Sequence, residues 1–132
     1  MTNTSGKRYV IDSWAWIAYF DGARAGKRVD EITLNAETFT SAVTVAEVLS
    51  KAEREGKDTN KIFNFIVSLS KVVSVDADLA SSAGLLHAHI KRDVHNFSLA
   101  DAFTLQTARG VGAKVLTGDP DFKNIKDAEF LE

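Results

Sequence analysis

Short apolar runs alternate along the chain with longer segments in which apolar residues recur every three or four positions. The short runs are typical of buried strands, and the longer spacing is typical of amphipathic helices. The expected strands cover 9–11, 39–43, 72–75, 114–116 and, as a short fifth strand, 128–131. The expected helices cover 14–20, 23–37, 45–55, 76–92 and 99–109, and a further helix starts at Asp58 or Thr59 and carries apolar residues as far as Leu69.

Polar residues and glycines mark the expected ends of these helices. Ser13, Thr44 and Ser98 each stand directly before a helical segment, which predicts that they are N-cap residues. Gly56 and Gly110 follow such segments and are predicted to end them. Strands that alternate with helices in this way predict an α/β fold around a mainly parallel sheet of four to five strands.

Acidic residues occur where such a fold would bring them together. Asp12 directly follows the first expected strand, and Asp119 and Asp121 follow the fourth. Glu47 and Asp101 are each expected in the first turn of a helix. Because ligands bind beyond the carboxyl ends of parallel strands, we expect these carboxylates to converge at that edge.

A group of carboxylates has a chemical use when a cation neutralises their repulsion. The hard divalent ions Mg²⁺ and Mn²⁺ prefer oxygen ligands, and such ions can activate water and stabilise the leaving oxygen in phosphodiester hydrolysis. The chain has no cysteine and three scattered histidines, so the sequence offers no zinc-binding set.

Each acid also has a simpler interpretation. The segments 44–47 and 98–101 fit the capping-box pattern, in which a carboxylate stabilises the start of a helix without a catalytic role. Asp12 and the 119–121 segment are compatible with ordinary turns. The functional interpretation therefore depends on the whole set and on its order along the chain.

Four segments that carry these acids resemble the PIN-domain family, in particular the VapC-type toxin ribonucleases of toxin–antitoxin pairs. They are Tyr-Val-Ile-Asp-Ser at 9–13, Val-Thr-Val-Ala-Glu-Val at 43–48, Leu-Ala-Asp-Ala at 99–102, and Leu-Thr-Gly-Asp-Pro-Asp-Phe at 116–122. They occur in the order found in the family, and the resemblance covers nearly the whole chain.

The resemblance implies a three-layer α/β/α sandwich and a single nuclease domain over 1–132. It implies an endoribonuclease that depends on Mg²⁺ or Mn²⁺, cleaves an RNA substrate, forms a homodimer and is blocked by a cognate antitoxin protein. Asp12, Glu47, Asp101 and Asp119 are carried over as the catalytic, metal-binding acids.

Three further residues are expected to support this site. Ser13 and Thr117 resemble hydroxyl groups that orient a water molecule or a carboxylate, and Asp121 is a possible fifth acid. Pro120 is unusual for the family at its position between the two aspartates. We expect it to stiffen the turn, and it leaves the direction of Asp121 open.

Composition and charge limit the number of domains, the possible chemistry and the expected location of the protein. The 132 residues fit one domain of ordinary size, and the net charge of −2 gives no overall basic signal for nucleic acid. Without cysteine, disulfides and cysteine nucleophiles are excluded. No apolar run reaches the roughly 20 residues that span a bilayer, and the polar segment 1–7 does not resemble a signal peptide, so we expect a cytoplasmic protein without a membrane partner.

Two other functions remain open from the residues alone. A phosphohydrolase with an aspartate nucleophile would suit Asp12 at a strand end, although the Asp-x-Asp arrangement expected of such enzymes is missing there. A non-catalytic module that binds RNA or protein on the same fold is the second alternative.

Aromatic residues crowd the first expected helix. Trp14 and Trp16 lie about 200° apart on a helical wheel, so they cannot face one core together. One of them is expected either at a dimer or antitoxin surface or buried on a second side. Phe63 and Phe65 present the same choice on a later helix, where an apolar groove would suit an antitoxin segment.

Overall fold

The computed structural model describes residues 6–132, so most of the polar segment at 1–7 lies outside the described residues. The strands are β1 (Arg8–Ile11), β2 (Glu37–Ser41), β3 (Lys71–Val73), β4 (Lys114–Thr117) and β5 (Ala128–Phe130). The helices are α1 (Ser13–Phe20), α2 (Gly26–Asn35), α3 (Ala42–Arg54), α4 (Thr59–Leu69), α5 (Ala77–Ile90) and α6 (Leu99–Val111), with a short 3₁₀ helix η1 (Pro120–Phe122).

The strands form one sheet in the order β3-β2-β1-β4-β5, and every neighbouring pair is parallel. β1 lies in the centre, where Val10 pairs with Phe39 on one side and with Val115 on the other. The predicted α/β fold with a parallel sheet is confirmed. Because all strands run the same way, their carboxyl ends share one edge.

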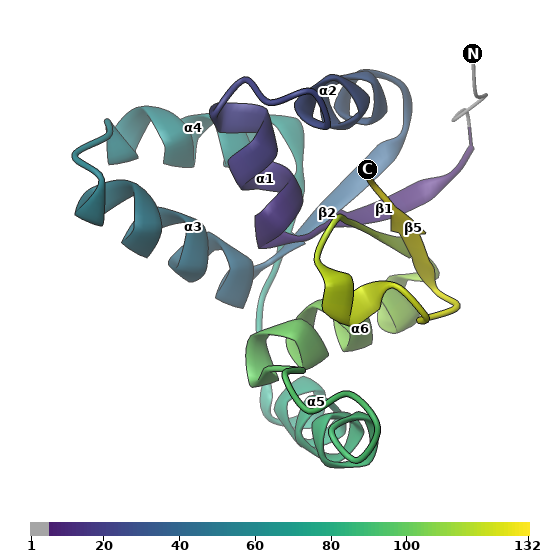
Figure 1. Cartoon of the computed structure of the whole chain (residues 1–132). Helices are drawn as coiled ribbons and strands as arrows, with labels where there is room; N and C mark the ends of the chain where they lie inside the picture. Colours follow the sequence, from purple (N-terminus) through teal and green to yellow (C-terminus); the bar gives the residue numbers. More distant parts are fainter. Residues whose placement is uncertain (1–5) are drawn as a thin grey trace.

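Helices cover both faces of the sheet, and the residues of β1 alternate between the two cores. Tyr9 and Ile11 pack with residues of α1, α2, α3 and α4, whereas Val10 packs with Leu105 of α6 and with Phe97. Figure 1 shows α1 to α4 on one side of β1, and α5 and α6 on the other. This is the expected three-layer sandwich.

The junction between β2 and α3 differs from its prediction. Ser41 caps α3, because its Oγ accepts a 3.2 Å hydrogen bond from the N–H of Val43. The expected cap, Thr44, lies inside the helix, buried, with its Oγ1 3.4 Å from Thr104 Oγ1. The predicted cap at Thr44 is wrong, because an earlier serine ends the strand and the apolar residues that follow it form the first helical turn.

Other boundaries shift by a few residues. Ser13 is the first residue of α1 and Asp12 holds the cap position, so the predicted cap at Ser13 is wrong. Glu37 belongs to β2 and not to a helix, because pairing with Arg8 draws it into the sheet. Helix α6 passes Gly110 and ends at Val111, and it is capped by Gly112, whose φ of 66° favours glycine. Asp58 and Ser98 do cap α4 and α6.

Within residues 6–132, no helix combines the length and the apolar character that crossing a membrane requires.

Candidate metal centre

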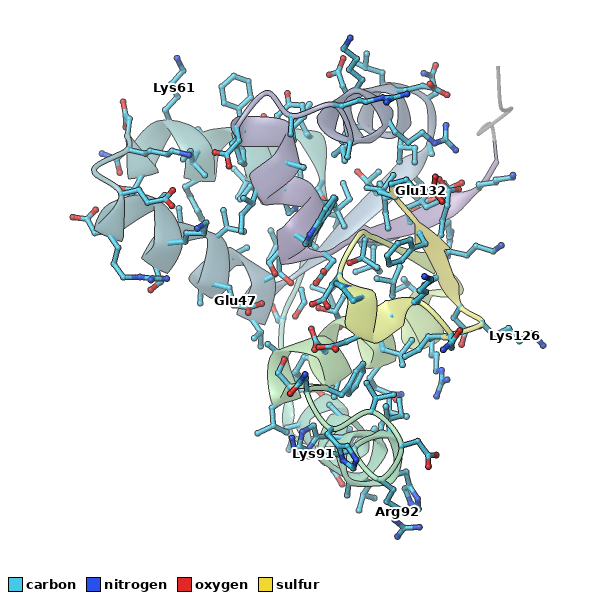
Figure 2. The ribbon with its side chains drawn as sticks, viewed as in Figure 1. Glu47, Lys61, Lys91, Arg92, Lys126 and Glu132 are labelled. Atoms are coloured by element: carbon cyan, nitrogen blue, oxygen red, sulfur yellow. The ribbon has the colours of Figure 1, made fainter. Side chains whose placement is uncertain are left out.

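Each acid singled out in the sequence lies close to the carboxyl edge of the sheet. Asp12 directly follows β1, and Asp119 lies two residues beyond β4, the neighbour of β1. Asp101 lies in the first turn of α6, and Glu47 lies on α3. Figure 2 labels Glu47 on the part of α3 that lies next to α6. The expected convergence of separate chain segments is therefore present.

The hydroxyl of Thr117 ties the first and last of these segments together. Its Oγ1 donates a 2.7 Å hydrogen bond to Asp12 Oδ2 and accepts a 3.0 Å hydrogen bond from the N–H of Asp119. Asp12 is only 2% exposed, and its own N–H donates to the carbonyl of Leu116 at 3.1 Å. One buried hydroxyl thus fixes both the carboxylate of Asp12 and the start of the turn after β4.

The turn after β4 aims a second aspartate at the site. Asp119 Oδ1 accepts a 2.9 Å hydrogen bond from the N–H of Asp121, and Pro120 is the first residue of the 3₁₀ helix η1. Proline suits this position because its fixed φ matches a helical start. The direction of Asp121, which the sequence left open, is toward the other acids.

Three aspartates form a compact group. Asp101, Asp119 and Asp121 each offer a carboxylate oxygen, and these oxygens all lie within 4.8 Å of one another. Asp101 also completes a capping box, since its Oδ2 accepts from the N–H of Ser98 at 2.9 Å and the hydroxyl of Ser98 accepts from the N–H of Asp101. Capping engages one oxygen of this carboxylate, so the structural and the functional interpretations of Asp101 are compatible.

Glu47 reaches the site in a way that the sequence did not predict. It is the sixth residue of α3, so it lies in the second helical turn, and the predicted capping box at 44–47 is wrong. Without a capping role, its carboxylate is available to the neighbouring acids. Asp101 and Asp119 lie close enough to raise the pKa of Glu47.

Comparison with known proteins identifies the family. A family model described as PIN domain matches residues 9–128. The chain belongs to the PIN domain family. The sequence-based resemblance is thereby confirmed over nearly the whole chain.

Solved structures share the fold of this PIN domain. A toxin–antitoxin complex from Klebsiella pneumoniae gives a TM-score of 0.75 at 22% identity over 92% of this chain and 95% of that one. VapC20 from Mycobacterium tuberculosis, described as a sarcin-ricin loop cleaving toxin, gives a TM-score of 0.74 at 17% identity over 94% of this chain and 99% of that one. VapBC2 from Rickettsia felis, bound to a promoter DNA fragment, gives a TM-score of 0.74 at 14% identity over 95% of this chain and 99% of that one. No curated protein matches the chain.

Burial and mutual repulsion make the acids of this PIN domain hold protons more tightly than usual. The pKa of Asp12 is raised to about 7, mainly by burial and also by the charges of Asp101 and Glu47, while the hydrogen bond from the Thr117 hydroxyl acts to lower it. Burial also raises the pKa values of Glu47, Asp101 and Asp121, and neighbouring carboxylates raise each of them again. A positive charge among these groups would reverse this effect.

The donor set fits a hard divalent cation. The three clustered groups are all carboxylates, and Glu47 adds a fourth nearby. Oxygen-only sets of this kind suit Mg²⁺ or Mn²⁺, whereas zinc sites are usually built from histidine and cysteine. Asp101, Asp119 and Asp121 could hold such an ion. Glu47 and the buried Asp12 lie close enough to Asp101 for their charges to interact with it.

One basic residue near the site was missed in the sequence. Lys91 follows α5, and its charge lowers the pKa of Asp121. Its Nζ donates to the carbonyl of His95 at 2.7 Å, and Figure 2 shows it with Arg92 at the end of α5. The sequence shows Lys91 shortly before the Ser98 cap. Its proximity to Asp121 could not be predicted, because that depends on how the α5–α6 connection folds back.

Proposed function

We propose that this PIN domain, spanning 1–132, is a Mg²⁺- or Mn²⁺-dependent endoribonuclease that hydrolyses RNA phosphodiester bonds as the toxin of a VapBC-type pair. The observation that carries the proposal is the group of three aspartate oxygens within 4.8 Å, built from α6 and the turn after β4. PIN domains are generally nucleases that use divalent metals, which agrees with this arrangement.

Each residue of the site has a proposed role that follows from its position. Asp101, Asp119 and Asp121 are the proposed ligands, and Glu47 neutralises the ion from the side of α3. The family resemblance gives Asp12 as a further ligand; its charge acts on Asp101 and Glu47, and its carboxylate accepts a hydrogen bond from Thr117. A bound divalent cation supplies activation of water and neutralisation of the charge that develops on the phosphate. Ser13, which lowers the pKa of Glu47, helps to keep that carboxylate ionised.

The substrate and the partner are inferred from the relatives. The Mycobacterium tuberculosis neighbour is described as a toxin that cleaves the sarcin-ricin loop, which supports RNA as the substrate class. Several neighbours are toxin–antitoxin complexes, which supports an antitoxin partner. We also propose a homodimer, as the family resemblance implies.

An exposed apolar strip on α4 agrees with a protein partner. Phe63 and Val67 lie one helical turn apart and are 42% and 43% exposed, and Phe65 on the same helix is 40% exposed. An amphipathic antitoxin helix would cover such a strip. Trp16, by contrast, is fully buried, so the expected surface role for an aromatic residue of α1 does not apply to it.

The phosphohydrolase alternative requires Asp12 as a nucleophile. A nucleophile must reach its substrate, yet the Asp12 carboxylate is 2% exposed and accepts a hydrogen bond from Thr117. This burial counts against that role. The remaining alternative, a non-catalytic binding module, differs from the nuclease in whether RNA is cleaved.

The test is cleavage of total cellular RNA by protein purified free of other chains, with Mn²⁺, Mg²⁺ or EDTA. We expect cleavage only with metal, and none from an Asp101→Asn/Asp119→Asn double variant. The matched control is Asp30→Asn/Asp78→Asn, which removes two exposed carboxylates elsewhere. Absence of cleavage under every condition would support the binding module, and cleavage that persists in EDTA and in the double variant would contradict the proposed site.

A further inference from the structure

Gly118 stands between Thr117 and Asp119 and has no room for a side chain. A Cβ atom built there would lie 2.4, 2.5 and 2.6 Å from Cη2, Cζ3 and Cζ2 of Trp14, closer than Cβ atoms approach other atoms in real proteins. The φ of Gly118 is not positive, so its backbone conformation does not require glycine. The requirement comes from the indole ring that covers it.

Trp14 belongs to the other half of the site. It is the second residue of α1, two positions after Asp12, and it is partly buried against the core on the α1 side of the sheet. Its six-membered ring therefore joins the start of α1 to the turn that carries Asp119 and Asp121. The Thr117 hydroxyl, which donates to Asp12 and accepts the N–H of Asp119, holds that turn from the sheet side, and the ring of Trp14 holds it from the helix side.

We propose that Trp14 is a positioning residue, and that its ring packing on Gly118 sets where Asp119 and Asp121 lie relative to Asp101. The inference rests on the proposed function, because it assumes that these aspartates bind a divalent cation. Neither residue is among the proposed ligands. Their contact acts through the turn, one residue away from Asp119.

A contact at this point affects binding more than an ordinary packing contact would. Mg²⁺ requires near-ideal octahedral geometry with short bonds to oxygen, so its sites tolerate little displacement of their ligands. Functional groups have to be held within roughly half an ångström of their productive positions. A turn pushed away from α1 by a single methyl group would separate two of the three aspartates from the third.

The test is Mn²⁺ affinity, measured by calorimetry on Gly118→Ala, Trp14→Phe and the Trp14→Phe/Gly118→Ala double variant. We expect Gly118→Ala to weaken binding by roughly tenfold, within the range of coupling measured for residues in contact. The smaller phenylalanine ring should make room for the methyl group. The double variant should then bind Mn²⁺ more tightly than Gly118→Ala alone, which a purely destabilising substitution would not produce.

Gly84→Ala is the matched control, because a Cβ at that position meets nothing within 4 Å. We expect it to bind Mn²⁺ like the wild type. Melting in EDTA identifies any variant that fails to fold, and the comparison of Trp14→Phe with the wild type then tests the contact without the added methyl group. The inference would be overturned if Gly118→Ala bound Mn²⁺ as tightly as the wild type. It would also be overturned if the loss of Mn²⁺ affinity in the double variant equalled the product of the losses in the two single variants. A wild type that binds no Mn²⁺ would overturn the proposed metal site as well.

Discussion

Thr117 donates a 2.7 Å hydrogen bond to the buried carboxylate of Asp12, although 105 positions separate the two residues in the sequence. The bond is possible because β1 and β4 are parallel neighbours in which Ile11 pairs with Leu116. The residues that come next, Asp12 and Thr117, therefore lie side by side. The same hydroxyl accepts the N–H of Asp119. A single side chain therefore couples the central strand to the turn that supplies two further acids.

Thr117→Val should keep the shape of this side chain and remove the hydroxyl. We expect a loss of activity of roughly ten- to a hundredfold, as for other groups that orient metal ligands. Because the Thr117 hydroxyl lowers the pKa of Asp12, its removal should raise that pKa and move the acidic limb of the pH–rate profile to higher pH. Thr117→Ser, which keeps the hydroxyl, should behave like the wild type. Full activity with an unshifted profile in Thr117→Val would contradict this role.

The stability of the metal-free protein should depend on the ionisation of Asp12. Its pKa is about 7 in the folded chain against an ordinary value of 3.8, so the folded state favours the protonated form. The protonated group therefore contributes to the free energy of unfolding. This contribution, on the order of 4 kcal/mol, is fully present below about pH 4 and is lost as the pH rises through about 7.

Asp12→Asn removes this dependence, since an amide has no proton to lose. In EDTA, the variant should lose less stability than the wild type between about pH 4 and pH 8, and should be the more stable protein at the upper end. Urea unfolding at a series of pH values measures the difference. Parallel curves for the two proteins would show that Asp12 is not held with a raised pKa.

Metal should stabilise the folded protein. Mn²⁺ at a hundredfold excess over its dissociation constant adds about 2.7 kcal/mol if it binds the folded chain alone. The gain should disappear in Asp101→Asn/Asp119→Asn, whose EDTA-treated form should be at least as stable as the wild type because two mutually repelling charges are gone. Thermal melting with Mn²⁺ and with EDTA provides both values. An equal shift in the wild type and the double variant would place the ion elsewhere.

Asp101 has a structural role and a proposed ligand role, and two substitutions separate them. Asp101→Asn keeps an oxygen that accepts the N–H of Ser98, whereas Asp101→Ala removes it. Both should lose Mn²⁺ binding, but only the alanine variant should lose about 1 kcal/mol of stability from the broken cap. Calorimetry and urea unfolding report the two effects independently. Retained Mn²⁺ binding in both variants would reduce Asp101 to a capping residue.

The sequence predicted the parallel sheet and the convergence of acids because both follow from local signals. Asp12 and Asp119 stand at or just beyond strand ends, and Asp101 follows a serine cap, so the rule for parallel sheets was enough to bring them together. Glu47 was expected near the site for the wrong reason. The cap of its helix is Ser41 and not Thr44, and that choice depends on where β2 stops pairing with its neighbours.

Other features of the site depend on contacts that periodicity does not report. The direction of Asp121 is set by its hydrogen bond to Asp119 and by Pro120 within a 3₁₀ turn. The packing of Trp14 on Gly118 joins residues 104 positions apart, which come together only when β1 and β4 pair. A glycine between two polar residues of a turn gave no sign that an indole ring would cover it.

Anomalous scattering of Mn²⁺ in crystals of this protein locates any bound ion and so tests whether these aspartates bind a divalent cation. We expect a peak within bonding distance of carboxylate oxygens of Asp101, Asp119 and Asp121, with Glu47 turned toward it, and no such peak in crystals of Asp101→Asn/Asp119→Asn. A strong peak at some other place on the molecule, or none among these aspartates at a Mn²⁺ concentration that supports RNA cleavage, would show that these aspartates are not the metal site.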